Sequence, residues 1–238
     1  SADGTLRRIN VPILMYHYVS PLPPNADQVR VGLTISPEIF RQHLQYLRDQ
    51  GYSTISLYEL HNALITGTSL PPKPIILTFD DGYIDHYTIV LPLLREFGYT
   101  GTFFIITGKA DTAEANYVTW DQITEMAAVG MNMEAHTKNH LDLRVRDFDV
   151  LVYQILGSIE SLQAHTDQAT RMFAYPAGRY DESTIAVLQS LGVWRAVTTE
   201  NGTLHTSDNL LEVSRLRING EMSVAGLAQI LASSHSGQ

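Results

Sequence analysis

Four glycines along the chain are each followed at once by a run of strand-forming residues, and this repeat constrains the fold most. Gly51, Gly98, Gly130 and Gly192 each stand between a helix-like segment and such a run. Glycine just past a helix supplies the left-handed residue that ends it. Helices that lead straight into strands in this way predict alternating helices and strands, and therefore a parallel sheet.

Eight segments have the composition of strands, and several are continuously apolar, as expected for parallel strands covered on both faces. They are Val11–Tyr16, Ser53–Ser56, Ile75–Phe79, Thr102–Thr107, Met131–Ala135, Met172–Tyr175, Arg195–Thr198 and Val213–Ile218. Seven or eight such strands predict a barrel, with an open doubly wound sheet as the alternative.

Helix starts and one break are also marked. Ser36, Ser56, Thr119 and Asp181 are expected N-caps, because each is followed by a sequence typical of a first helical turn. Pro92 predicts a kink or restart in the helix that follows residue 83. The proline-rich segment Ser20–Ile35 is expected to be a long loop that forms either a rim or a lid.

The chain has 238 residues, a net charge of −9 and no cysteine. This length suits one α/β domain, which we expect to span residues 1–238. Without a run of Lys or Arg, nucleic acids and anionic membranes are poor partners. The lack of cysteine excludes thiol catalysis, Cys-ligated zinc and disulfides.

No stretch reaches the roughly 18 apolar residues that a membrane helix needs, so we expect no integral membrane segment. The start, Ser1-Ala2-Asp3-Gly4, fits a processed terminus or the boundary of an expressed piece. An export signal is then expected to have been removed upstream. We therefore expect a secreted or cell-surface protein, and a monomer.

Two carboxylates, Asp80 and Asp81, close the apolar run Ile75–Phe79 and are followed by Gly82. Successive strand residues point to opposite faces, but at a strand end the glycine lets the backbone turn, so both side chains can share one cavity. Alone, an Asp-Asp-Gly string is usually a turn.

Two histidines, His136 and His140, come at the end of the predicted strand Met131–Ala135. The carboxyl ends of parallel strands meet at one edge, where α/β proteins place their sites. One Asp and two His can hold a zinc-like ion and leave positions open, while the other Asp acts as a base. A lone histidine pair is more often surface or core, but the two motifs together favour a metal-assisted hydrolase.

These motifs resemble those of the polysaccharide deacetylases of carbohydrate esterase family four, the superfamily of the nodulation-factor deacetylase, over nearly the whole chain. The resemblance implies a single-domain distorted (β/α) barrel of about seven parallel strands. It implies that Asp80 is the catalytic base and that Asp81, His136 and His140 bind one divalent metal ion. Zinc suits these ligands best, and cobalt, nickel and iron(II) suit them too.

A third motif of the family is matched by residues 175–178, where the amide after the proline, here that of Ala177, helps to hold the oxyanion. The family commonly has an Arg that pairs with the base two residues before this proline. Ala174 stands there instead, and Arg171 and Arg179 are the nearby candidates for the missing cation. The family's fourth motif and the Leu-x-His of its fifth motif are absent.

The histidine of the fifth motif acts as general acid in the family, and we expect His17 to replace it. His17 ends the first predicted strand, in an opening that resembles the branch that deacetylates exported poly-N-acetylglucosamine. The alternative is that His17 caps the strand by bonding to backbone. The expected substrate contacts, next to the motif segments, are Tyr83, Tyr175, Pro176 and Tyr180.

The resemblance therefore implies a hydrolase that removes N-acetyl groups from an N-acetylglucosamine-containing polysaccharide, with Asp80 as general base and a water activated by the metal. One alternative is an O-acetyl esterase on acetyl-xylan, because an ester leaving group needs only a weak acid. Another is a non-catalytic carbohydrate-binding relative, which the missing Arg and fourth motif leave open.

Overall fold

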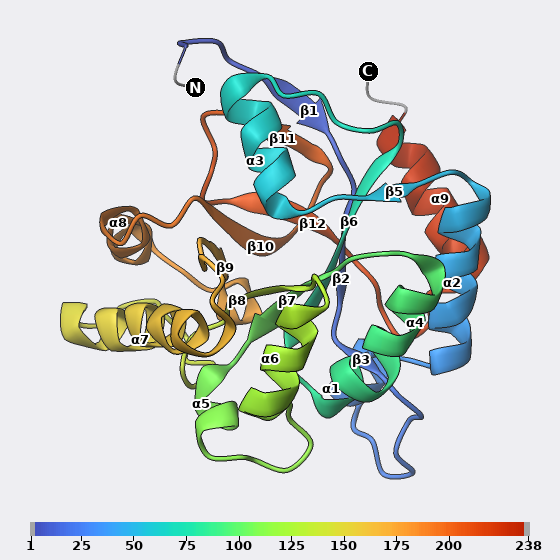
Figure 1. The fold of residues 1–238 in the computed structure, drawn as a ribbon, viewed down its shortest axis with the longest axis horizontal. Helices are drawn as coiled ribbons and strands as arrows, with labels where there is room; N and C mark the ends of the chain where they lie inside the picture. The colour runs from blue at the N-terminus through green and yellow to red at the C-terminus, as the bar shows by residue number, and fades with distance from the viewer. Residues whose placement is uncertain (1–2, 236–238) are drawn as a thin grey trace.

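The computed structural model describes residues 3–235, so the predicted domain bounds at 1 and 238 lie outside the described residues. Its centre is a closed ring of parallel strands, in the order β2, β12, β10, β9, β8, β7, β6, which the pairing of β2 with β6 completes (Figure 1). The strands are Ile13–Tyr16 (β2), Pro74–Asp81 (β6), Thr102–Ile105 (β7), Asn132–Ala135 (β8), Met172–Ala174 (β9), Arg195–Asn201 (β10) and Val213–Arg217 (β12). The predicted barrel is confirmed, and the open sheet is excluded.

Five short strands lie outside the ring. β5 (Ser53–Thr54) was predicted, but it pairs only with the first two residues of β6 and takes no part in closing the barrel. β1 (Arg8–Asn10) pairs with β11 (Leu204–Thr206), and β3 (Tyr18–Val19) pairs with β4 (Thr34–Ile35). These four were not predicted, because two or three residues are too few to show an alternating pattern.

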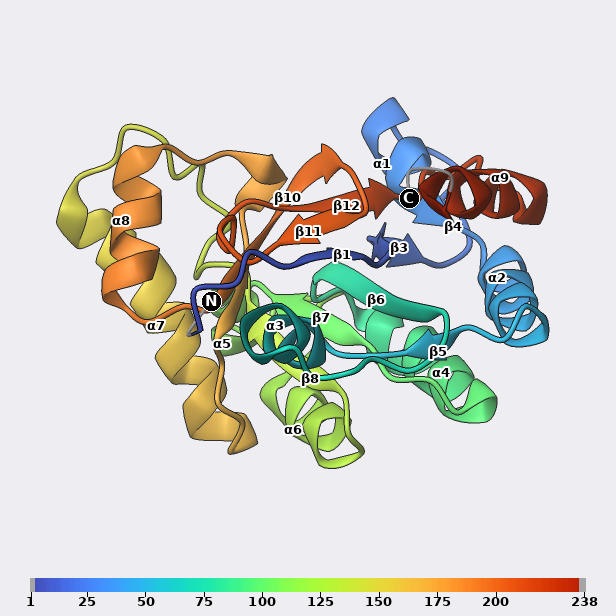
Figure 2. The same cartoon turned by 90° about the horizontal axis from the view of Figure 1, so that it is seen from above.

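Helices surround the barrel (Figure 2). They are Gln28–Leu33 (α1), Pro37–Asp49 (α2), Leu57–Thr66 (α3), Leu91–Phe97 (α4), Thr107–Asp111 (α5), Trp120–Ala128 (α6), Phe148–Thr166 (α7), Glu182–Ser190 (α8) and Val224–His235 (α9). The predicted caps are confirmed, since Ser36, Ser56, Thr119 and Asp181 each accept a hydrogen bond from a first-turn N–H. Among residues 3–235, no helix is long and apolar enough to cross a bilayer.

The chain after β6 forms a π-helix, η1 (His86–Val90), before α4 begins at Leu91. Pro92 lies in the first turn of α4, so the predicted restart is confirmed. π-helical turns are rare in proteins, and those that occur are often found at functional sites. Here the turn places His86 in the core, beside the end of β2.

Alternate strand residues build two apolar cores. One core lies between the barrel and its surrounding helices, and the other fills the barrel interior, with residues such as Ile13, Ile76 and Phe104. Three leucines of α3 join the interior core near the amino ends of the strands: Leu57, Leu60 and Leu64. Because α3 closes the barrel at the amino ends of its strands, the polar residues at the carboxyl ends line the opposite opening.

The segment Ser20–Ile35 is only partly a loop. Asp27 caps α1, and β4 follows directly, so the prediction of a loop is wrong for residues 28–35. The six-residue helix escaped prediction because one short turn shows no periodicity. The segment is packed onto the barrel, since the Arg30 guanidinium lies 3.1 Å from the centroid of the Tyr18 ring.

Candidate metal and catalytic centre

Asp80 and Asp81 end β6 inside the rim of the barrel, where both are buried. Asp81 has a φ of 81° and Gly82 a φ of 77°. Two consecutive left-handed residues turn the chain at the strand end. This turn ends the strand alternation that would otherwise send the two carboxylates to opposite faces.

His136 and His140 follow β8, and their rings lie 5.0 Å apart between centroids. Their spacing suggested one helical turn, but the chain makes a tight turn in which Thr137 and His140 both have positive φ. The Thr137 hydroxyl accepts a hydrogen bond from the His140 N–H at 2.9 Å. His136 Nδ1 donates to the Ala174 carbonyl at 2.7 Å, which leaves Nε2 with its lone pair free.

The three side chains converge on one point. Asp81 Oδ1 lies 3.2 Å from His136 Nε2 and 3.4 Å from His140 Nε2. One ligand atom from each residue lies within 4.8 Å of the others. Asp81 Oδ1 is buried and has no hydrogen-bond partner in the described part of the chain, as expected for an atom that faces a cation. The residues therefore fit a divalent metal ion.

The charges agree with this fit. Burial alone would raise the pKa of Asp81, but the adjacent His136, with the charges of His17 and His140, holds it below its ordinary value. Burial lowers the pKa of His140, and the neighbouring His136 lowers it further. An ionised carboxylate and a neutral imidazole are the forms that bind metal.

Asp80 is paired with Arg215 of β12, a residue that was not predicted. Arg215 donates to both Asp80 oxygens at 2.7 Å, and also to the Thr78 hydroxyl and the Thr198 carbonyl. The two predicted candidates are wrong, because Arg171 reaches the Gly192 carbonyl and Arg179 pairs with Asp142. Arg215 lies on the same face of β12 as Val213, which belongs to the interior core. A charged residue at such an apolar position was the signal in the sequence for a buried partner of opposite charge.

His17 lies in the same pocket, with its side chain 11% exposed and Nε2 4.0 Å from Asp80 Oδ2. A general acid is expected on the side of the metal opposite the base, whereas the His17 ring lies beside the Asp80 carboxylate. Burial lowers the pKa of His17, although the charges of Asp80 and Asp81 act to raise it. His17 Nδ1 has no hydrogen-bond partner among the described residues, so this ring does not cap the strand through that atom.

The backbone around His17 is tied down by two residues at the start of η1. His86 Nε2 donates to the His17 carbonyl at 2.7 Å, and Asp85 Oδ2 accepts from the Val19 N–H at 3.0 Å. Both side chains are buried. The role of His86 was not predicted, because nothing local to it in the sequence indicates a partner at the end of another strand.

The predicted sugar contacts are placed unequally. Tyr175 is fully buried and its hydroxyl donates to the Leu211 carbonyl, so the structure gives its ring a packing role and does not support a sugar contact. Pro176 is buried as well. Tyr180 is half-buried, stacks on Tyr175 at 4.1 Å and donates to Glu212.

Ala177 is exposed and has a φ of 52°, and Gly178 after it has a φ of 67°. A Cβ on Gly178 would lie 2.2 Å from the Thr199 hydroxyl, so only glycine fits there. This strained turn places the Ala177 amide in the segment that directly follows β9. The carbonyl of Ala174, the last residue of β9, accepts the hydrogen bond from His136.

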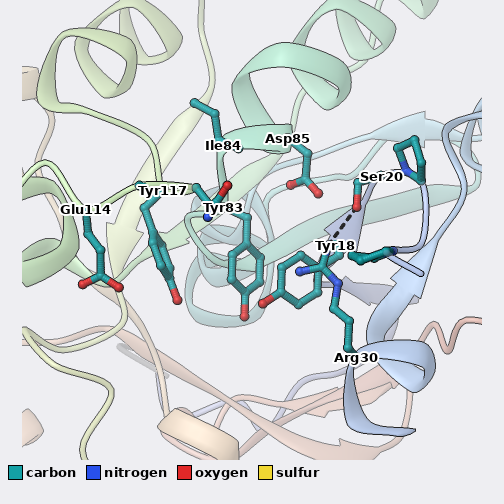
Figure 3. Close-up of a pocket in the computed structure, with 12 residues that line it drawn as sticks. Tyr18, Ser20, Arg30, Tyr83, Ile84, Asp85, Glu114 and Tyr117 are labelled. Atoms are coloured by element: carbon teal, nitrogen blue, oxygen red, sulfur yellow. Dashed lines mark hydrogen bonds between the residues drawn. The ribbon is translucent and has the colours of Figure 1, made fainter. Parts of the chain in front are cut away.

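Tyr83 lies in a row of three tyrosines that lines a pocket of about 500 Å³ beside the centre (Figure 3). Its ring stacks on Tyr18 at 3.5 Å and meets Tyr117 at 5.3 Å. Arg30 stands at one end of the row and Glu114 at the other (Figure 3). Because neighbouring rings cover its faces, Tyr83 offers its hydroxyl edge to a ligand.

Comparison with known proteins identifies the family. The family model for polysaccharide deacetylases matches residues 67–196. YxkH of Bacillus subtilis, whose name places it among the polysaccharide deacetylases, is 31% identical over 92% of this chain and 75% of its own length. The crystal structure of the Streptococcus pyogenes deacetylase PplD in complex with acetate is 34% identical, with a TM-score of 0.87 over 94% of this chain and 99% of PplD.

The poly-beta-1,6-N-acetyl-D-glucosamine N-deacetylase of Escherichia coli is 24% identical over 83% of this chain. The match covers only 35% of that longer relative. The members of the matched family are hydrolases that remove acetyl groups. The chain belongs to the polysaccharide deacetylase family.

Proposed function

We propose that this protein removes N-acetyl groups from an N-acetylglucosamine-containing polysaccharide by metal-dependent hydrolysis. The observation that carries the proposal is the position of Asp80, an Arg-paired carboxylate directly beside the Asp81, His136 and His140 cluster. A carboxylate next to a metal site with open positions is the arrangement needed for hydrolysis. A non-catalytic relative would have no use for all four residues in this arrangement.

When bound, a divalent cation would lower the pKa of a water molecule and polarise the acetyl carbonyl. Asp80, held by Arg215, takes the proton of the attacking water. The Ala177 N–H donates to the oxyanion that the acetyl carbonyl oxygen becomes when water attacks the carbon. His17, protonated for this step, gives its proton to the sugar nitrogen, since an amine leaves poorly without one. Burial lowers the pKa of His17, which favours transfer of the proton from the protonated ring.

The tyrosine-lined pocket supports a sugar polymer as substrate. It adjoins the centre at Tyr83, two residues after Asp81, and its lining includes side chains that can bond hydroxyls: Ser20, Arg30, Asp85, Glu114 and Asn116. The E. coli relative is named for poly-β-1,6-N-acetylglucosamine, which makes this polymer the first candidate. Because such a polymer lies outside the cell, the proposal includes a secreted or surface-bound enzyme.

The test is release of acetate, followed by mass spectrometry of the product, across four substrates: poly-β-1,6-N-acetylglucosamine, chitin oligomers, peptidoglycan and acetyl-xylan. We expect deacetylated amino sugars, and a loss of about 10²–10⁴-fold in Asp80→Asn with its metal content unchanged. Turnover of acetyl-xylan without turnover of any N-acetylglucosamine polymer would replace the amidase by an esterase. Equal activity in a metal-loaded Asp80→Asn enzyme would show that another group is the base.

A further inference from the structure

The indole of Trp194 is exposed and lines a second pocket. Trp194 is 40% exposed and lies directly before β10, where its backbone N–H donates to the Arg171 carbonyl at 2.8 Å. The pocket has a volume of about 410 Å³, within the usual range for small-molecule sites. Its lining residues come from α3, α8, the two residues before β10 and the segment before β12.

This pocket is separate from the catalytic centre. Trp194 and residues 208–212 precede β10 and β12, whereas Asp81 and His136 end β6 or follow β8. Because all strands of the barrel run parallel, the pocket and the centre belong to opposite ends of the strands.

Trp194 is held as a rigid platform by two residues of α3. The His61 ring stacks on it at 4.7 Å with an interplanar angle of 20°, and Tyr58 meets it edge-on at 5.8 Å. Burial, with the charge of the neighbouring Arg195, lowers the pKa of His61 to about 4, so its ring is neutral at ordinary pH. A neutral, fixed aromatic pair offers a flat apolar surface.

The lining also carries polar side chains, namely Gln189 of α8, Asp208 and Asn209. Side-chain amides both donate and accept hydrogen bonds, and a carboxylate accepts them. A flat apolar platform in the same pocket as amides and a carboxylate matches a pyranose ring, which has C–H groups on one face and hydroxyls around its edge.

We propose that this pocket binds an N-acetylhexosamine unit, stacked on Trp194 and hydrogen-bonded by Asn209 and Gln189. The choice of an amino-sugar unit rests on the proposed function, since the polymer that supplies substrate also supplies the ligand. A second attachment point would raise the effective concentration of a long chain around the enzyme.

The experiment uses the intrinsic fluorescence of Trp194. The chain has two tryptophans, and Trp120 stacks on His165 at 3.9 Å on a different helix. In the Asp80→Asn, Trp120→Phe protein, Trp194 is the sole reporter and the ligand is not consumed. Titration with hexamers of N-acetylglucosamine, β-1,4- and β-1,6-linked, should give a saturable change in emission. Asn209→Ala and Gln189→Ala should each weaken that binding about 2- to 12-fold, the loss of one net hydrogen bond.

The matched control is the Asp80→Asn, Trp194→Phe protein, in which Trp120 reports and should stay silent. A silent Trp194 at millimolar hexamer, or an affinity unchanged in both Asn209→Ala and Gln189→Ala, would overturn the site. Acetate release by the wild-type enzyme together with a silent Trp194 removes this site and leaves the proposed function standing. A change in Trp194 emission without acetate release by the wild-type enzyme supports this site and removes the proposed function.

Discussion

The Arg215 guanidinium forms two parallel hydrogen bonds with the Asp80 carboxylate, each 2.7 Å long. Both side chains are almost completely buried, at 0% and 3% exposure. Burial alone would raise the pKa of Asp80, but the charge and hydrogen bonds of Arg215 hold it below its ordinary value. This fork keeps the carboxylate ionised and fixes its plane, which is what a positioned base requires.

Arg215→Lys should therefore impair turnover while the fold survives. Lysine keeps the charge but cannot form two parallel bonds with a carboxylate. Loss of one charged hydrogen bond predicts a fall in kcat of roughly 10- to 100-fold. The measurement is acetate release, with metal content determined on the same samples.

The matched controls are Arg171→Lys and Arg179→Lys, because these residues lie close in sequence to the third motif but pair elsewhere. Both should turn over like the wild type. If either control loses more activity than Arg215→Lys, the pairing seen here is not the one used in catalysis.

One divalent metal ion per chain should be found by elemental analysis, bound at roughly 2.0–2.2 Å if it is zinc. His140→Ala should lower the metal content, because it removes one of three donors. Chelation should abolish activity and lower the melting temperature, since a metal that binds only the folded state stabilises it. His165→Ala, which removes an exposed histidine, is the control. Equal metal in the two variants would contradict the ligand set.

His17→Ala should reduce kcat on amides by about 10²–10⁴-fold, the usual range for a general acid. The loss should be smaller on an activated acetyl ester, whose leaving group needs no proton. Metal content and melting temperature should stay close to wild type. An equal loss on ester and amide would contradict the acid role and leave His17 a part of the substrate pocket.

His86→Phe tests whether the hydrogen bond to the His17 carbonyl positions that ring. Phenylalanine fills much the same buried space but donates nothing. We expect a lower kcat with unchanged metal content, and faster hydrogen exchange at the backbone amides of residues 17–19. His86→Gln, which keeps a donor, should recover part of the activity.

Asp85→Asn serves as the comparison, because an amide oxygen can still accept from the Val19 N–H. It should exchange and turn over nearly as the wild type does. If His86→Phe leaves both exchange and kcat unchanged, the bond is incidental to the position of His17.

The barrel could be predicted from the sequence because its signals are local. Each strand of the ring has its own apolar run, and glycines and caps mark the helix ends beside it. The pairs β1–β11 and β3–β4 could not be predicted, since these strands are two or three residues long and each pairs with a segment elsewhere in the chain. The same holds for α1, which packs Arg30 against a ring twelve residues earlier in the chain.

The site divides in the same way. Asp80 with Asp81, and His136 with His140, are each adjacent or nearly so in sequence, so the motifs could be recognised. Arg215 is 135 residues from Asp80, and His86 is 69 residues from His17. No local pattern connects such pairs, and only the closed ring brings β12 and η1 against β6 and β2.

The buried His205 should make the protein less stable in acid. It is 3% exposed, and its Nε2 donates to the Val11 carbonyl at 2.8 Å. Burial, with a smaller effect of Arg195, lowers its pKa to about 4 from an ordinary value of 6.5. Between these values the unfolded chain binds a proton that the folded chain does not, so stability falls as the pH drops from 6.5 towards 4. The shift corresponds to at most about 3 kcal/mol.

Urea unfolding at pH 7.5 and pH 5 measures this loss directly. In His205→Gln the fall in unfolding free energy between the two pH values should be smaller than in the wild type, because the titrating group is gone. His165→Gln, which changes an exposed histidine, should keep the wild-type difference. The same pH difference in all three proteins would mean that His205 is not protonated selectively on unfolding, and that the acid sensitivity comes from other groups.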